Sequence, residues 1–119
     1  MPYYCGGNIW GSGSTDECYK YAFALDEWTL SGLMPEAKSS CGSDSSESWG
    51  LIVAGGTSGG NSVETTDNGE VFEPLPSLPE ENWDFCTVII DEDRIFACGG
   101  YNPLADTLIF QKSTNIWNR

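Results

Sequence analysis

Short apolar runs alternate with glycine-rich and polar segments along the whole chain. A half-apolar segment follows each glycine pair after a polar loop, and it closes on a large aromatic residue. Short apolar runs bounded by Gly, Pro, Asn and Asp are typical of β-strands. The runs "PYYC", "LIVA" and "IFAC" precede Gly6–Gly7, Gly55–Gly56 and Gly99–Gly100, and the closing aromatics are Trp28, Phe72 and Trp117. The pattern predicts an all-β chain made of a repeated unit.

The spacing of two further landmarks supports a true repeat. A Met-Pro pair ends at Pro35 and a Leu-Pro pair ends at Pro79, each seven residues after its aromatic. Pro35 precedes Gly55 by 20 residues, and Pro79 precedes Gly99 by 20 residues. Two aligned landmarks separated twice by the same distance indicate duplication of one structural unit.

Each unit predicts four short strands, lettered a to d in chain order. Turn chemistry separates them, since "LDE", "DNGE", "DED" and "KSTN" contain the residues that tight reversals favour. The strands are expected at 39–43 and 83–90 (a), 2–5, 49–54 and 94–98 (b), 17–22, 63–66 and 107–110 (c), and 27–30, 70–75 and 115–117 (d). The segment "KSSCGSDSSESWG" is polar, so the first strand a is expected to be short or poorly formed.

Charge and composition exclude several function classes. Five Lys and Arg residues face 18 Asp and Glu residues, a formal charge of −13 that repels phosphate backbones and anionic membranes. No run approaches the roughly 20 apolar residues of a membrane span. The chain has no histidine, which removes histidine-based catalytic triads and zinc sites. We therefore predict an acidic protein that binds no nucleic acid, metal or cofactor and inserts into no membrane.

The motif resembles kelch repeats: an apolar strand, a double glycine, an aromatic strand end and a Met-Pro or Leu-Pro pair. The resemblance implies a kelch-type β-propeller segment with four-stranded antiparallel blades, approximately 2–32 (lacking strand a), 37–75 and 83–119. In such a fold the glycines Gly6, Gly7, Gly55, Gly56, Gly99 and Gly100 lie where blades crowd, and Trp28, Phe72 and Trp117 pack between blades. A P-loop would need Lys and then Ser or Thr after its last glycine, which "GGTSGGN" lacks.

The repeat count predicts a ring that this chain alone does not close. About three blades are present, whereas propellers usually hold about four to eight. The remainder is expected from a longer propeller, from further copies of the chain, or from another chain. The arginine frequent three residues after Met-Pro in these repeats is replaced by Lys38 and Asn82.

The five cysteines suggest two cross-strand pairs. Cys5 ends a strand b and Cys18 opens the next strand, while Cys86 and Cys98 face each other across the "DED" turn. Both pairs are disulfide candidates if the Cα atoms lie within about 7 Å. Buried free thiols are the alternative, and Cys41 is left over. The arrangement is similar to extracellular invertebrate kelch proteins, where such pairs are disulfides, which favours secretion over a cytoplasmic location.

The leading hypothesis is a non-catalytic module that presents its b–c and d–a loops to a protein or glycan partner. The candidate contact residues on this loop face are Asn8, Trp10, Lys38, Asn61, Trp83, Tyr101 and Asn102. The alternatives are a scaffold fragment of a larger galactose-oxidase-like propeller enzyme and a structural, actin-associated kelch protein. Those oxidases use copper, tyrosines, histidines and a cysteine–tyrosine crosslink, so a chain without histidine holds no such copper site.

Overall fold

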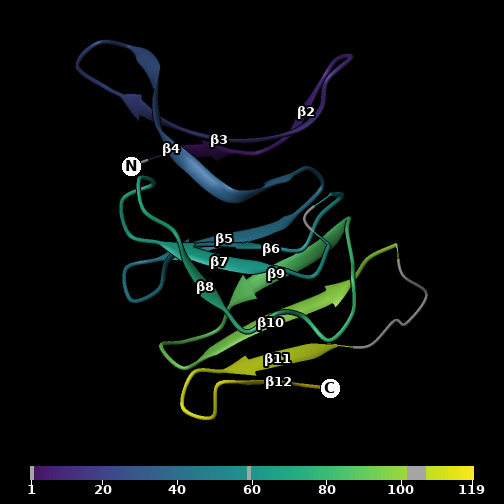
Figure 1. Cartoon of the computed structure of the whole chain (residues 1–119). Helices are drawn as coiled ribbons and strands as arrows, with labels where there is room; N and C mark the ends of the chain where they lie inside the picture. The colour runs from purple at the N-terminus through teal and green to yellow at the C-terminus, as the bar shows by residue number, and fades with distance from the viewer. Residues whose placement is uncertain (1, 59, 102–106) are drawn as a thin grey trace.

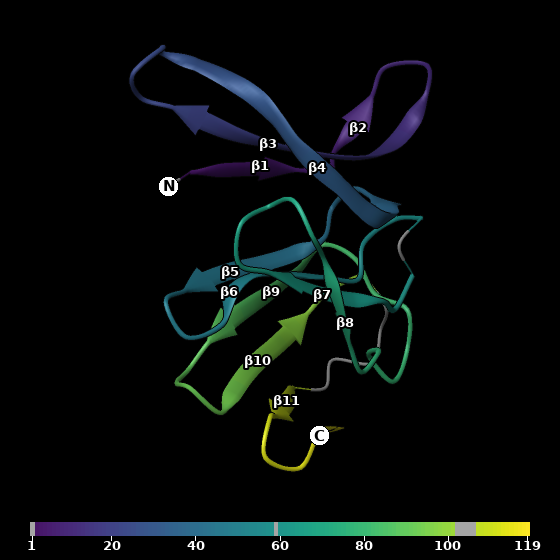
Figure 2. The ribbon, with the colours of Figure 1, turned by 60° about the vertical axis from the view of Figure 1, so that its left-hand side comes forward.

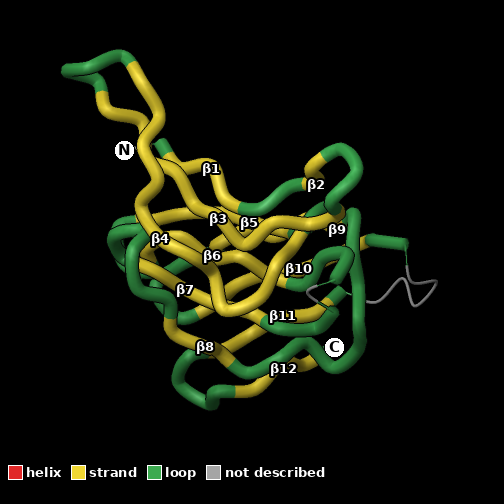
Figure 3. The backbone as a smooth tube through the Cα atoms, turned by 45° about the horizontal axis from the view of Figure 1, so that its top comes forward, coloured by secondary structure: helices red, strands yellow, loops and turns green. Residues whose placement is uncertain are grey.

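The computed structural model describes residues 2–58, 60–101 and 107–119, and all regular structure in them is β (Figure 3). Three four-stranded antiparallel sheets lie one on another in chain order (Figures 1 and 2). The all-β expectation with three antiparallel blades is therefore confirmed. The part of the chain that the structure describes contains no helix long and apolar enough to cross a membrane.

The first sheet consists of β1 (Tyr3–Cys5), β2 (Asn8–Ile9), β3 (Gly13–Ala22) and β4 (Glu27–Lys38). β3 is its centre, because β1, β2 and β4 all pair with it. The long β3–β4 hairpin extends away from the other two sheets (Figure 1). No strand corresponding to strand a pairs with the outer edge of β1 among the described residues.

The second and third sheets each contain four strands in the expected order, although the first strand a begins at Gly42 instead of at residue 39. In both sheets each strand pairs with the next one in the chain, so the spatial order of the strands is the sequence order. The second sheet comprises β5 (Gly42–Ser46), β6 (Gly50–Ala54), β7 (Val63–Thr66) and β8 (Glu73–Leu75), and the third comprises β9 (Phe85–Ile89), β10 (Arg94–Gly99), β11 (Leu108–Gln111) and β12 (Ile116–Asn118).

Two apolar layers hold the three sheets together. Cys18, Met34 and Val53 are buried between the first and second sheets. A larger layer between the second and third sheets is formed by Trp49, Ile52, Ala54, Val63, Leu78, Phe85, Ile95, Ala97, Phe110 and Trp117. Burial of apolar side chains supplies the main stabilisation of such stacked sheets.

Gly6 and Gly55 lie against the segments that lead from one sheet to the next. A Cβ atom on Gly6 would lie 2.5 Å from the Lys38 carbonyl oxygen, and one on Gly55 would lie 2.6 Å from the Asn82 carbonyl oxygen. Both glycines have positive φ, a backbone region that disfavours other residues. The close approach of these backbone segments therefore requires glycine at these two positions.

The expectation of a poorly formed first strand a is wrong. β5 pairs with β6 along its whole length, from Gly42 opposite Ala54 to Ser46 opposite Gly50. Its side chains are small because β5 lies against β9, and a Cβ on Gly42 would lie 2.1 Å from Thr87 Oγ1. Polarity here reflects crowding between inner strands and a hydrogen bond from the Ile89 amide to Asp44 Oδ2 at 2.8 Å.

The three strand-d aromatics do not share one environment. Trp117 is buried between the second and third sheets, and Phe72 is partly buried between the first and second. Trp28 is 49% exposed, so the expectation that it packs between blades does not hold within this chain. The reason is its location on the outward face of the first sheet, where the described residues place no further sheet.

Candidate functional site

One end of the stack collects the loops that follow the glycine pairs and those that connect one sheet to the next. These loops, with the β2–β3 turn, lie on the right in Figure 1, and the other tight turns between neighbouring strands lie on the left. We call the first end the glycine-loop face, defined by 6–16, 55–62, 76–84 and the described residues of 99–107. Loops carried by a rigid β scaffold are common places for recognition.

Trp83 and Tyr101 form a stacked aromatic pair on the glycine-loop face. Their ring centroids are 4.9 Å apart with planes inclined by 18°, and the Tyr101 amide donates to the Trp83 carbonyl at 2.9 Å. Tyr101 is 69% exposed, whereas Trp83 is partly buried. The Trp83 ring therefore holds the Tyr101 ring in place at the surface. Aromatic rings held in this way are favoured contact residues in protein interfaces. The candidate Asn102 lies outside the described residues.

Trp10 lies at the turn of a small hairpin formed by β2 and the start of β3. Asn8 pairs with Ser14 and Ile9 with Gly13, which directs the turn away from the sheet stack. Trp10 is 100% exposed and Asn8 is exposed as well. Both candidates are therefore accessible on the glycine-loop face.

Lys38 does not belong to an exposed surface, which corrects the expectation that it contacts a partner. Its side chain is 0% exposed, and its Nζ lies 3.2 Å from Glu64 Oε2. The ammonium also donates to the Gly55 and Ser62 carbonyls at 3.2 and 3.1 Å and to Ser62 Oγ at 2.5 Å. A buried charge is tolerated when it is paired and hydrogen-bonded, so Lys38 links the first sheet to the second.

Asn82 occupies the same place in the next repeat. Its Nδ2 donates to the Gly99 carbonyl at 3.0 Å, as Lys38 does to Gly55. Its own carbonyl accepts from the Gly56 amide at 2.8 Å, and the Lys38 carbonyl accepts from Gly7 at 2.7 Å. Asn61, another candidate, is partly buried and donates to the Leu78 carbonyl at 3.1 Å. These amides therefore hold loops together between sheets.

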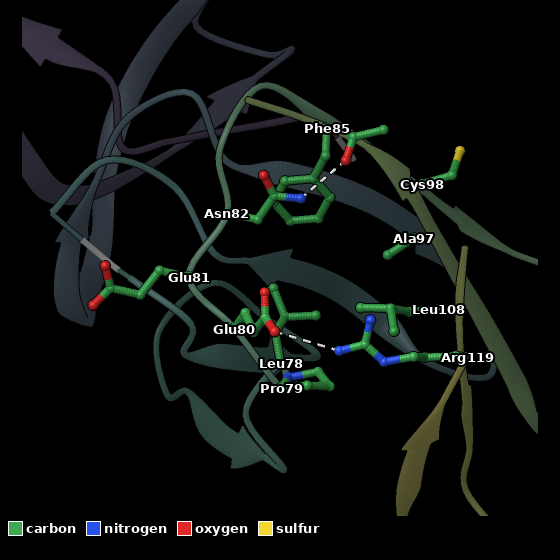
Figure 4. A pocket seen from close by; sticks show the side chains of 11 residues that line it. Leu78, Pro79, Glu80, Glu81, Asn82, Phe85, Ala97, Cys98, Leu108 and Arg119 are labelled. Carbon is green, nitrogen blue, oxygen red and sulfur yellow. Dashed lines mark hydrogen bonds and ion pairs between the residues drawn. The ribbon is translucent and has the colours of Figure 1, made fainter. Parts of the chain in front are cut away.

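A small cavity opens between the second and third sheets beside Asn82 (Figure 4). Phe85, Ala97 and Leu108 provide its apolar wall, and the ion pair of Glu80 with Arg119, at 3.4 Å, borders it. Its volume is about 30 Å³, enough for a water molecule rather than for an organic substrate. The cavity is therefore no substrate pocket within this chain.

The cysteines divide into one bridge and three thiols. Cys5 and Cys18 are opposite each other on β1 and β3 and form a disulfide, which confirms the first candidate pair. Cys86 and Cys98 are also directly opposite, on β9 and β10, but are free thiols. Partial burial and then the facing Cys86 raise the pKa of the Cys98 thiol. Burial likewise raises the pKa of Cys41.

The described residues offer no set of ligands for a metal centre. Within 2–58, 60–101 and 107–119, no three Cys, Asp or Glu side chains converge, and the chain has no histidine. A copper centre of the oxidase type needs imidazole ligands, so these residues do not fit one. The groups that the glycine-loop face offers for recognition are therefore aromatic rings and side-chain amides.

Sequence reasoning missed the two buried or shared carboxylates that join the sheets. Glu64 and Asp44 were expected to lie in a strand c and beyond a strand a, with no role assigned. Glu64 neutralises Lys38, and Asp44 accepts the Ile89 amide across the sheet boundary. The available signal was Glu64 inside the predicted strand 63–66, since a charged residue in a buried strand requires a partner.

No family model matches the sequence. No curated protein matches it either. Among solved structures the chain is similar to a novel fungal alcohol oxidase with catalytic diversity among the AA5 family, in complex with copper. The TM-score is 0.71 at 18% sequence identity, covering 97% of this chain and 26% of the oxidase chain.

This structural similarity extends to the whole arrangement of three sheets. At 18% identity it shows the fold alone, which is that of a β-propeller segment. The expected fold class is confirmed, and the chain spans about a quarter of the length of that oxidase. The ring is not closed by these three blades.

Proposed function

We propose that this chain is a scaffold segment of a larger galactose-oxidase-like propeller. It contributes blades of the kelch type and no catalytic residue of its own. The observation that carries the proposal is the match of all three sheets to 26% of a copper-containing alcohol oxidase. The open outward faces of the first and third sheets support the same conclusion, because stacked blades bury such faces in a complete ring.

The copper chemistry of such an enzyme would come from other blades. Oxidases of the galactose-oxidase type use histidine ligands, and this chain has none. Its described acidic and sulfur side chains form no metal-binding group. The segment would therefore position loops and cover the faces of neighbouring blades. An alcohol substrate would be bound elsewhere in the protein.

The Cys5–Cys18 disulfide supports a location outside the reducing cytosol. Disulfides persist mainly in oxidising compartments. We therefore assign the larger protein to the extracellular space or a secretory compartment. An oxidase that consumes oxygen outside the cell is consistent with this assignment.

The direct test is the activity of the complete protein that contains this segment. Copper-loaded protein is expected to oxidise a primary alcohol and release hydrogen peroxide, measured with a peroxidase-coupled dye, and a chelator should abolish the signal. A complete protein that has a closed propeller but binds no copper would refute the oxidase proposal. The chain alone serves as the negative control.

The exposed aromatics favour one second candidate, a protein-binding surface on the glycine-loop face. Tyr101 stacked on Trp83, together with the fully exposed Trp10, would present large rings at little entropic cost. Tyr101→Ala and Trp10→Ala in the complete protein would then weaken binding to its purified partner and leave alcohol oxidation unchanged. Equal loss of both properties would argue against a separate binding role.

A further inference from the structure

An aromatic pair on the outward face of the first sheet is repeated, buried, in the third sheet. Tyr21 and Trp28 are register partners on β3 and β4, with ring centroids 5.4 Å apart. Phe110 and Trp117 are register partners on β11 and β12, with centroids 5.3 Å apart. The second pair is 0% and 8% exposed against the neighbouring sheet, whereas Trp28 is 49% exposed. The same aromatic pair is thus buried in the third sheet and exposed to solvent in the first.

The buried pair also shows how the neighbouring sheet is recognised. The Trp117 indole Nε1 donates to the Pro76 carbonyl at 2.8 Å, in the linker that follows β8. Pro76 lies two residues before the Leu78–Pro79 pair that marks the end of each repeat. Trp28 has the same position on its own sheet, so its indole would meet the corresponding carbonyl of a preceding blade.

The rest of the outward face follows the same correspondence. Tyr4 on β1 occupies the position of Val53 on β6, because each lies two residues before its glycine pair. Val53 is 1% exposed between the first two sheets, and Tyr4 is 60% exposed. Leu30, two residues after Trp28 on the same face of β4, is exposed too. This face is therefore the counterpart of an interface that the chain forms twice internally.

The outer edge of β1 supplies a second, independent feature. The strands equivalent to β1 pair with β5 and β9, whereas the described residues place no strand there for β1. The Gly6 amide donates to the Glu17 carbonyl and the Tyr21 amide to the Pro2 carbonyl. In an antiparallel strand, alternate residues direct their backbone N–H and C=O groups to opposite edges. Because Pro2 and Gly6 bond to β3, the Tyr3 and Cys5 amides point towards the open edge. Such an edge accepts an added strand.

We propose that the outward face of the first sheet binds a further blade of this repeat, together with an inner strand that adds antiparallel to β1. The blade presents an apolar face to Tyr4, Tyr21 and Trp28, as the second sheet does to Phe110 and Trp117, and its linker carbonyl accepts the Trp28 indole N–H. This inference rests on the proposed scaffold role and names the partner of that face. A second copy of the chain is a poorer fit, because its own β9 is already paired with β10 and brings no strand for β1.

The test extends the full chain with its own repeat. Residues 39–93, which hold the second sheet, its linker and β9, are placed directly before Met1, so that the repeat register is preserved. Hydrogen exchange should slow at least about tenfold at the Tyr3 and Cys5 amides, and the Tyr4 amide should change little. Acrylamide quenching of Trp28, isolated by difference from a Trp28→Phe version of each chain, should fall about threefold.

A shorter extension separates strand addition from blade docking and remains informative if the long chain misfolds. Residues 83–93 alone before Met1 should protect Tyr3 and Cys5 while Trp28 stays open to acrylamide. If both extended chains fold, as judged by near-ultraviolet circular dichroism, and neither shows protection, the inference is wrong. Concentration-dependent protection of Tyr3 and Cys5 in the unextended chain would identify a second copy as the occupant and would also overturn it. Neither readout depends on oxidase activity, so failure of the copper assay would leave this result intact.

Discussion

The Lys38 ammonium lies 3.2 Å from the Glu64 carboxylate, with 0% and 4% of the two side chains exposed. The pair joins the end of β4 in the first sheet to β7 in the second. Among the described residues, Glu64 Oε2 accepts no hydrogen bond, so the ion pair with Lys38 is what compensates its buried charge. Removing one partner leaves an unpaired buried charge, which is far more costly than losing both.

We therefore expect Lys38→Met to lower the free energy of unfolding by about 3–5 kcal/mol. Combining it with Glu64→Leu should recover most of that loss, because no buried charge then remains. Urea denaturation followed by tryptophan fluorescence measures both effects.

A surface ion pair provides the matched control for this prediction. Lys20 lies 3.1 Å from Glu70, whose side chain is 57% exposed, so water screens the interaction. Lys20→Met should cost less than about 1 kcal/mol. Equal losses for the two lysine variants would show that Lys38 is not acting as a buried charge.

The Asp44 carboxylate connects the inner strands of the second and third sheets. Its Oδ2 accepts from the Ile89 amide, and its Oδ1 accepts from the Ser45 amide, both at 2.8 Å. Asp44→Ala should lower stability by about 1–3 kcal/mol, because it leaves the Ile89 N–H without its acceptor. Amide exchange at Ile89 should accelerate selectively, as read by nuclear magnetic resonance.

Asp44→Asn tests whether the hydrogen bond rather than the charge is needed. The amide oxygen of asparagine still accepts, so this variant should keep most of the protection at Ile89. If Asn and Ala behave alike, the acceptor geometry is not what orders the inner strands.

The repeat made the fold predictable, whereas the environment of individual side chains depended on contacts between sheets. Glycine pairs, closing aromatics and equal spacing located eleven strands because each marks a local backbone requirement. Lys38 is polar and follows a Pro-Glu segment, which is typical of an exposed loop, yet the neighbouring sheet encloses it. Its shared position with Asn82 was visible in the sequence, and the common hydrogen bond to a glycine carbonyl appears only in three dimensions.

The β5 strand shows the opposite limit. Its polar sequence indicated weak structure, because apolar periodicity is the main strand signal in a single sequence. Pairing with β6 and crowding against Thr87 and Phe85 select small residues there instead. The repeat position of Trp28 predicted that it packs between blades. That prediction holds only when a further blade covers the outward face of the first sheet.

Gly55 should be far less tolerant of substitution than Gly11, although both have positive φ. A Cβ on Gly55 would lie 2.6 Å from the Asn82 carbonyl oxygen, and one on Gly11 would meet nothing within 4 Å. Gly11→Ala should cost about 1–2 kcal/mol from backbone strain alone. Gly55→Ala should cost about 2–4 kcal/mol, because the second and third sheets must also move apart.

Thermal unfolding of the two alanine variants measures this difference directly. The larger decrease in melting temperature is expected for Gly55→Ala. Similar decreases would mean that the close approach to Asn82 relaxes without cost, and the crowding of glycines between sheets would then be unimportant for stability.

Cys41 gives a prediction about pH. Burial raises the pKa of its thiol, the nearby Lys38 opposes this effect, and Glu64 reinforces it. The folded state therefore binds the proton more tightly than the unfolded state does. The associated stability is fully present below the unfolded thiol pKa and is lost as the pH rises through the folded one. Alkylation by iodoacetamide, which requires the thiolate, should consequently reach its half-maximal rate at a higher pH in the folded chain.

The measurement uses a Cys86→Ser/Cys98→Ser variant, so that Cys41 is the remaining thiol beside the Cys5–Cys18 disulfide. Rates are followed by intact mass between about pH 7 and 10, in buffer and in urea. A higher midpoint in buffer supports the buried environment of Cys41. Coincident midpoints would show that the thiol is solvated in the folded chain and that the layer between the first and second sheets is looser than its packing indicates.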